Sequence, residues 1–132
     1  MIRRILIGAA LLPVAAVIVS GQGTTRSTND GVYTAAQAAR GKTTFEAKCS
    51  GCHEPSRFSG KSFQEEWEGK AMKEIWDIAS GTMPEDNPGS LRTQEYGDIM
   101  AYFLSLNEYP TGDKELEASG PAMAQIKIEK KY

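Results

Sequence analysis

The sequence of 132 residues contains only two cysteines and one histidine, and it has no internal repeats or low-complexity segments. With so few soft ligands, a tetrahedral zinc site made of Cys and His would have to borrow a carboxylate. An excess of basic charge is also lacking, because 15 basic residues stand against 17 acidic ones. This balance argues against nucleic acid as a partner, since phosphate backbones are bound by basic surfaces. The length allows one small domain.

Long hydrophobic runs are lacking too, and the one near the N-terminus is short. Arg3 and Arg4 precede an uncharged apolar run from Ile5 to Val19. A membrane-spanning helix needs about 20 apolar residues, and Pro13 further weakens a span. The pattern predicts a secretory signal peptide over residues 1–21 that is cleaved rather than kept as an anchor. We therefore expect a periplasmic protein with no stable membrane insertion after cleavage.

Cleavage would make the chain more acidic. Loss of Arg3 and Arg4 lowers the basic count from 15 to 13 against 17 acidic residues, which leaves a net charge of about −4. Such a surface favours a partner with a positively charged docking face, or it is simply a solvated surface.

The two cysteines and the histidine lie together in the stretch Cys49-Ser50-Gly51-Cys52-His53. Cys-x-x-Cys-His is the pattern at which a c-type haem is attached, because each thiol can add to a haem vinyl group while the adjacent imidazole reaches the iron. A redox dithiol would expect a strand and helix unit around the pair, and a zinc site would expect further ligands. Neither context is present. The motif predicts one haem c, covalently attached through Cys49 and Cys52, with His53 as an iron ligand.

Capping and spacing signals predict helices on both sides of this motif. Thr34 with Gln37 forms a capping-box pattern before a helix that leads into the haem motif. Ser62 with Glu65 gives the same pattern before a short second helix, and Gly81 is placed as the C-terminal cap of a third.

The last predicted helix, capped by Thr93, has one strongly apolar side. Its apolar residues at i, i+3, i+4 and i+7 are Tyr96, Ile99, Met100 and Phe103. The first helix is its natural partner, because Gly41 allows a close approach and Phe45 lies on the same face.

A second chemical signal lies in the loop after the third helix, where Met83 precedes Pro84. Proline holds the preceding residue extended, which lets the thioether of Met83 project toward a metal. The stretch Asn87-Pro88-Gly89-Ser90 predicts a type II turn that returns the chain to the last helix. Met72 and Met100 lie on apolar helix faces instead, and we expect both in the core.

Composition divides the rest of the chain. Residues 22–30 contain no large apolar side chain and are expected to form a flexible leader before a domain over residues 31–107. Residues 108–132 are polar and punctuated by proline and glycine, which predicts an extended tail that partly wraps the domain. Ile126 and Ile128 alternate as in a short strand, for which the sequence indicates no pairing partner.

One set of features matches a known family: Gly41, Phe45, Cys49–His53, Met83-Pro84 and Ile99–Phe103. These features resemble class I c-type cytochromes over about residues 31–107. The resemblance implies an all-α cytochrome c fold of three to four helices around one covalently bound haem, with the first and last helices crossing. It also implies that His53 and Met83 are the two axial ligands of the iron.

The resemblance extends to function. The short spacing from His53 to Met83 is similar to that of small bacterial members. The stretches Pro88–Leu91 and Tyr109–Gly112 are similar to bacterial cytochromes that accompany quinoprotein dehydrogenases. The resemblance therefore implies other redox proteins as partners, with a quinoprotein dehydrogenase and an oxidase as candidates.

Filled axial positions leave no place for substrate on the iron, so we expect an electron-transfer protein and not an enzyme. The leading hypothesis is an exported one-electron carrier between a dehydrogenase, or another periplasmic donor, and a terminal acceptor. One alternative is a fixed cytochrome subunit of a quinoprotein dehydrogenase complex. Another is a haem enzyme or gas-binding protein with an open iron site, which would need Met83 away from the iron and a polar distal group. The sequence has no second histidine for that role.

Overall fold

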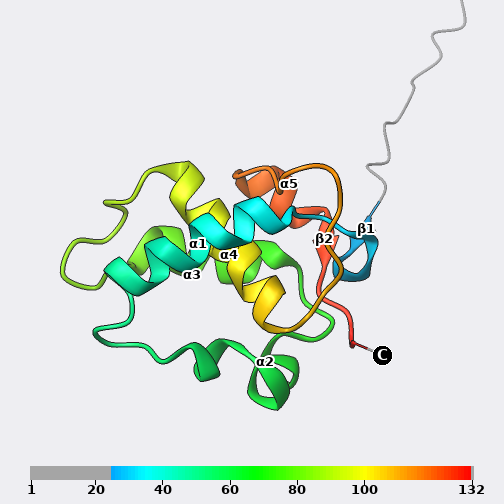
Figure 1. Cartoon of the computed structure of the whole chain (residues 1–132), viewed down its shortest axis with the longest axis horizontal. Helices are drawn as coiled ribbons and strands as arrows, with labels where there is room; N and C mark the ends of the chain where they lie inside the picture. The colour runs from blue at the N-terminus through cyan, green and yellow to red at the C-terminus, as the bar shows by residue number, and fades with distance from the viewer. Residues whose placement is uncertain (1–24, 132) are drawn as a thin grey trace, which may run out of the picture.

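The computed structural model describes residues 25–131, and the predicted signal peptide over residues 1–21 lies outside them. Its α-helices are α1 (Ala35–Lys48), α2 (Gly60–Trp67), α3 (Met72–Thr82), α4 (Thr93–Leu106) and α5 (Gly120–Ala124) (Figure 1). Short 3-10 helices cover Thr28–Asp30 (η1) and Pro55–Phe58 (η2), and two short strands cover Arg26–Ser27 (β1) and Ile126–Lys127 (β2). The fold is all-α, as predicted, and no helix of residues 25–131 is both long and apolar enough to cross a membrane.

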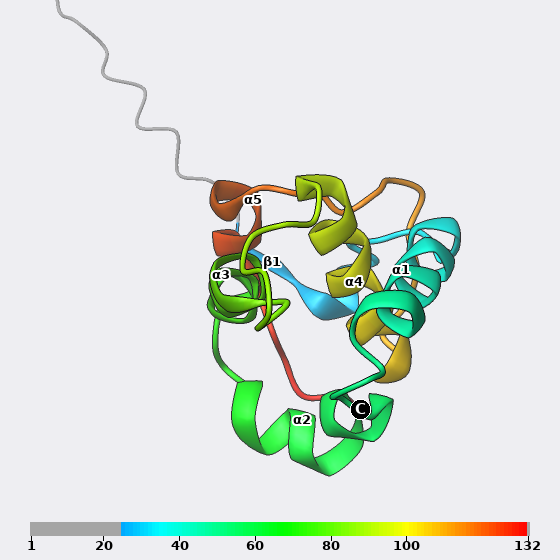
Figure 2. The same ribbon diagram turned by 90° about the vertical axis from the view of Figure 1, so that its left-hand side faces the viewer.

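Helices α1 and α4 cross in direct contact, as predicted for the first and last helices of the domain (Figure 2). A Cβ atom on Gly41 would lie only 1.8 Å from the backbone oxygen of Asp98, so the two backbones approach where a side chain would not fit. Phe45 continues the contact, with its ring centroid 5.6 Å from that of Tyr102 and 6.0 Å from that of Phe103. Glycine and aromatic ring together set the crossing.

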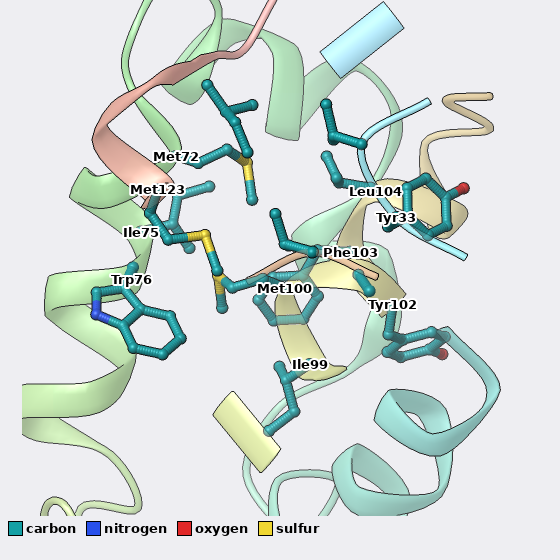
Figure 3. Close-up of a cluster of buried hydrophobic side chains, with 14 of the residues drawn as sticks. Tyr33, Met72, Ile75, Trp76, Ile99, Met100, Tyr102, Phe103, Leu104 and Met123 are labelled. Carbon is teal, nitrogen blue, oxygen red and sulfur yellow. The ribbon is translucent and has the colours of Figure 1, made fainter. Parts of the chain in front are cut away.

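Helix α3 closes the core from another side. Its Met72, Ile75 and Trp76 are buried on one face, as their helical spacing predicts. Met100 of α4 and Met123 of α5 are also fully buried, and Figure 3 shows them with Met72 between α3 and α4. Met72 and Met100 therefore lie in the core, as expected.

The start of α1 confirms one half of its capping prediction. The Thr34 hydroxyl accepts a hydrogen bond from the backbone N–H of Gln37 at 3.1 Å. The Gln37 side chain does not return to the cap, because it is fully buried and hydrogen-bonds the backbone N–H and carbonyl of Leu116. A long-range contact has replaced the local one.

The predicted cap of the second helix is wrong. Helix α2 begins at Gly60, with Ser59 at the N-cap, and Ser62 lies inside the helix. The first N–H of the helix, that of Gly60, donates to the side-chain oxygen of Asn107 at 2.9 Å. The side chain that satisfies this helix end comes from beyond α4, so a local sequence pattern could not reveal it.

Two other helix ends are shifted by one or two residues. Gly81 is not the C-cap of α3. The helix continues to Thr82, and its C-cap is Met83, whose backbone is extended before Pro84. Proline, and not glycine, ends the helix.

The N-terminus of α4 also differs from the prediction. Thr93 is the first residue of this helix, and Arg92 is its N-cap. The backbone N–H of Arg92 donates to the Glu95 carboxylate at 2.8 Å, which supplies the cap from the third helical position.

Of the flexible leader that we expected over residues 22–30, residues 22–24 lie outside the described part of the chain, and residues 26–30 form ordered structure. Strand β1 pairs in parallel with β2, with Arg26 opposite Ile126. Thr28 is fully buried in η1 and accepts a hydrogen bond from the backbone N–H of Glu129 at 3.1 Å. Backbone pairing and one buried hydroxyl order residues 26–30, although they contribute no large apolar side chain. The same pairing gives the strand at Ile126 a partner, for which the sequence had no indication.

Residues 108–131, here called the C-terminal strap, return along α1 and α4 to the N-terminal segment (Figure 1). The Tyr33 hydroxyl donates to the carbonyl of Tyr109 at 2.7 Å near the start of the strap. Near its end, the N–H of Ile128 donates to the carbonyl of Lys70 at 2.8 Å. The strap thus ties together the segments before α1 and between α2 and α3.

The strap is not wholly extended, since it contains helix α5. The Ser119 hydroxyl caps this helix by accepting from the N–H of Ala122 at 3.2 Å, and Pro121 lies in its first turn. Both are ordinary helix-start signals, and proline there is favourable and not disruptive.

Candidate haem site

The turn Cys49–His53 continues directly from the C-terminal end of α1. Cys49 is the C-cap residue, and its N–H donates to the carbonyl of Phe45 at 2.8 Å. Its own carbonyl accepts from the N–H groups of Cys52, at 3.1 Å, and of His53, at 2.9 Å. The structure therefore brings both thiols and the imidazole together on one hydrogen-bonded turn.

The two thiols are free, and their surroundings differ. Cys49 is half-buried and Cys52 is exposed. Burial raises the pKa of the Cys49 thiol, because removal from water disfavours the thiolate. Both side chains are available for thioether bonds, and Cys49 lies on the side closer to the core.

His53 is half-buried and packs against Phe58, a side chain that the sequence did not indicate as part of the site. Its ring centroid lies 5.6 Å from that of Phe58, with an edge-to-face angle of 72°. Phe58 in turn stacks on Phe103 of α4 at 4.3 Å. Pro55 at the first position of η2 was the available signal, because proline favours a helix start that would carry Phe58 back toward the core.

Met83 follows α3 in an extended conformation and is half-buried. Its carbonyl accepts from the Tyr96 hydroxyl at 2.6 Å and from the N–H of Gly89 at 3.1 Å. The predicted turn after it is present, since Gly89 has φ of +73° and the N–H of Ser90 donates to the carbonyl of Asn87 at 3.3 Å. The carbonyl of Met83 is thus held by a side chain of α4 and by a backbone N–H of its own loop.

The motif and the Met83 loop lie at the same end of the molecule (Figure 1). The elements around them carry apolar side chains that pack on the core but remain partly exposed: Cys49, Phe58, Trp67, Ala79 and Leu91. Ile78 on α3 is 51% exposed. Apolar surface that the chain itself leaves uncovered is what the faces of a haem would cover.

These residues fit a haem c. Two free thiols and an imidazole share one turn, and a thioether is held on a loop at the same end of the molecule. The ligand roles of His53 and Met83 stay predictions. Two surface hollows lie elsewhere, beside α1 at Tyr33 and Lys42 and between α2 and the end of α4, and their lining includes none of the four predicted site residues.

The family model described as cytochrome C oxidase, cbb3-type, subunit III matches residues 36–103. The match covers more than half of the chain and runs from α1 through the motif and the Met83 loop to most of α4. Comparison with curated proteins and comparison with solved structures give no match.

Proposed function

Because the chain belongs to the cytochrome c oxidase cbb3-type subunit III family, a family of c-type cytochromes, we propose that it is an exported one-electron carrier of the periplasm. It would take electrons from a dehydrogenase or another donor and pass them to a terminal acceptor. The observation that carries the proposal is the placement of Cys49, Cys52 and His53 on one turn, with Met83 on a loop at the same end of the molecule.

Each site residue has a distinct role in this proposal. Cys49 and Cys52 would hold the haem through thioether bonds, each formed by addition of an S–H group across one vinyl group, so that attachment would need no oxidant. His53 and Met83 would be the two side-chain ligands of its iron. When bound, the haem supplies one-electron chemistry through its ferrous and ferric states. Two side-chain ligands leave no open position for a substrate, which favours electron transfer over catalysis.

Glu65, Glu66 and Glu68 precede α3 and Glu85 and Asp86 follow it, and this grouping of acidic side chains supports a basic docking face on the partner. Glu65 lies 3.5 Å from Lys61, and Glu66 lies 2.7 Å from Arg57, so basic neighbours offset both charges. Glu85 and Asp86 on the Met83 loop are exposed and have no ion pair within residues 25–131.

The family description favours a second candidate, a fixed cytochrome subunit of an oxidase complex, because it names an oxidase subunit. A fixed subunit of a dehydrogenase complex is the corresponding alternative on the donor side. Both differ from a free carrier in how the protein behaves during purification. A fixed subunit would co-purify with its complex under mild conditions. A free carrier would be recovered from the periplasmic fraction without other proteins.

Two experiments test the proposal. N-terminal sequencing of the purified exported protein tests cleavage. Mixing of its reduced and oxidised forms with candidate dehydrogenases and oxidases tests electron transfer. We expect a chain that begins near residue 22, and electron transfer with at least one donor and one acceptor. A His53→Ala variant serves as a control for specific transfer. Substrate turnover at the iron of the wild type, or binding of a ligand there without displacement of Met83, would favour the enzyme alternative.

A further inference from the structure

We propose that Tyr96 positions the loop that presents Met83, and thereby sets how readily Met83 can be displaced from the haem iron. The proposal rests on the proposed function, in which Met83 is the sixth iron ligand. The Tyr96 hydroxyl donates to the carbonyl of Met83 at 2.6 Å and accepts from the N–H of Leu91 at 3.4 Å. One side chain therefore contacts the backbone at both ends of the loop.

Tyr96 is suited to this role because it belongs to the rigid core. It lies in the first turn of α4 and is only 4% exposed. Its ring packs edge-to-face on Trp76 of α3, with the centroids 6.3 Å apart. Helix α4 is itself held against α1 at Gly41. The hydroxyl thus has a fixed position, to which a surface loop can be attached.

The other hydrogen bonds of the loop between Met83 and Leu91 are mostly internal. The N–H of Gly89 donates to the carbonyl of Met83, that of Asn87 to Pro84 and that of Ser90 to Asn87, while the N–H of Met83 donates to the carbonyl of Ala79 at the end of α3. Within residues 25–131, the Tyr96 hydroxyl makes the side-chain hydrogen bonds that join this loop to another element. Without them the loop could swing away as a unit while its internal turn stays intact.

Removal of the hydroxyl alone should leave the fold in place. In Tyr96→Phe the ring still packs on Trp76, and the Met83 carbonyl keeps its bond from Gly89. What changes is the equilibrium between a closed loop and an open one. An added iron ligand such as imidazole binds only when Met83 has left, so its apparent affinity rises with the open fraction.

The experiment is a titration of the ferric holoprotein with imidazole, followed at the far-red sulfur-to-iron absorption band. We expect Tyr96→Phe to bind imidazole about tenfold more tightly than the wild type, as loss of the shorter of its two bonds, that to the Met83 carbonyl, predicts. The matched control is Tyr33→Phe, which removes another tyrosine-to-carbonyl bond, to Tyr109 at 2.7 Å, at the start of α1. It should lower stability without changing imidazole affinity.

The outcomes separate this inference from the proposed function. If the wild type lacks the absorption band, or if Met83→Ala keeps it, the sixth-ligand assignment is wrong. If the band depends on Met83 but Tyr96→Phe binds imidazole as the wild type does, the positioning role alone is wrong. Equal tightening in Tyr96→Phe and Tyr33→Phe would also overturn it, because the effect would then follow overall stability.

Discussion

At the scale of single residues, the site combines side chains whose chemical roles differ although they share one turn. Cys49 packs against the core, Cys52 is exposed, and His53 contacts the ring of Phe58. Burial raises the pKa of the Cys49 thiol, because removal from water disfavours the thiolate. Of the two proposed attachment points, Cys49 is thus half-buried and Cys52 is exposed.

Covalent attachment is the first prediction at this scale. We expect the haem of the wild type to stay with the protein in acid acetone, and the haem of a Cys49→Ala, Cys52→Ala double variant to extract, because thioether bonds survive this treatment and axial bonds do not. Ser50→Ala is the control, since Ser50 lies between the cysteines and, among the described residues, its exposed hydroxyl bonds only to the carbonyl of Glu46. Extraction of most haem from the wild type would refute covalent attachment.

The second prediction distinguishes two methionines. Met83→His should keep the iron six-coordinate but lower the reduction potential, because imidazole stabilises ferric iron better than a thioether does. Met100 is fully buried, so Met100→Leu should leave the potential unchanged and cost less than about 1.5 kcal/mol of stability. Redox titration and urea unfolding measure the two quantities. If the potential fell in Met100→Leu and stayed unchanged in Met83→His, Met100 and not Met83 would be the iron ligand.

At the scale of elements, the crossing of α1 and α4 is the contact with the least room. A Cβ atom at Gly41 would lie 1.8 Å from the oxygen of Asp98, whereas one at Gly81 of α3 would meet no atom within 4 Å. We predict that Gly41→Ala lowers the free energy of unfolding by about 2 kcal/mol or more, because the helices must separate.

The matched variant for this prediction is Gly81→Ala. It should be neutral or stabilising by about 0.5 to 1 kcal/mol, since alanine favours a helix more than glycine does. Urea unfolding of the two holoproteins gives the comparison. Equal stability of Gly41→Ala and the wild type would show that the crossing tolerates a wider separation than the structure indicates.

At the scale of the whole molecule, the C-terminal strap joins segments that are far apart in the sequence. The buried Gln37 side chain holds it by two hydrogen bonds to Leu116, one 2.9 Å and one 2.7 Å long. Gln37→Leu would leave a buried N–H and a buried carbonyl without partners, so we expect a loss of about 2 kcal/mol or more. Gln125→Leu, at an exposed strap position, should change stability by less than about 0.5 kcal/mol. Similar losses in both variants, measured by thermal unfolding, would contradict this account of the strap.

Docking also belongs to the whole molecule. If a basic partner binds near the Met83 loop, the rate of electron transfer to it should fall as salt rises, because exposed charges are screened over about 10 Å at 0.1 M ionic strength. Changing Glu85 and Asp86 to their amides should lower the association rate more than changing Glu65 and Glu66, whose charges are offset by basic neighbours. The potential should not change.

Stopped-flow mixing with a cationic redox partner across a salt series measures this effect. A rate that is flat or rises with salt would remove the acidic docking surface. An apolar patch that includes the exposed Ile78 would then be the better account.

The sequence by itself determined the features that depend on neighbouring residues. The Cys49–His53 motif, the helical spacing of α3 and α4, and the glycine turn before α4 are local patterns, and the structure has the helices and the turn where they were predicted. The approach of α1 and α4 could also be predicted, because the apolar side of α4 needs a partner and a glycine on the face of α1 lets another helix come close.

Only the tertiary structure decided the features that depend on residues distant in sequence. Asn107 satisfies the first turn of α2, and Gln37 leaves its own helix cap to hold the strap. Residues 26–30 are ordered by a strand that lies about a hundred positions later. Polar groups such as these form hydrogen bonds with partners that lie close to them only in the folded chain. Tyr96 is the clearest case, since its spacing indicates only an apolar helix face and its hydroxyl acts on a loop that the fold places beside it.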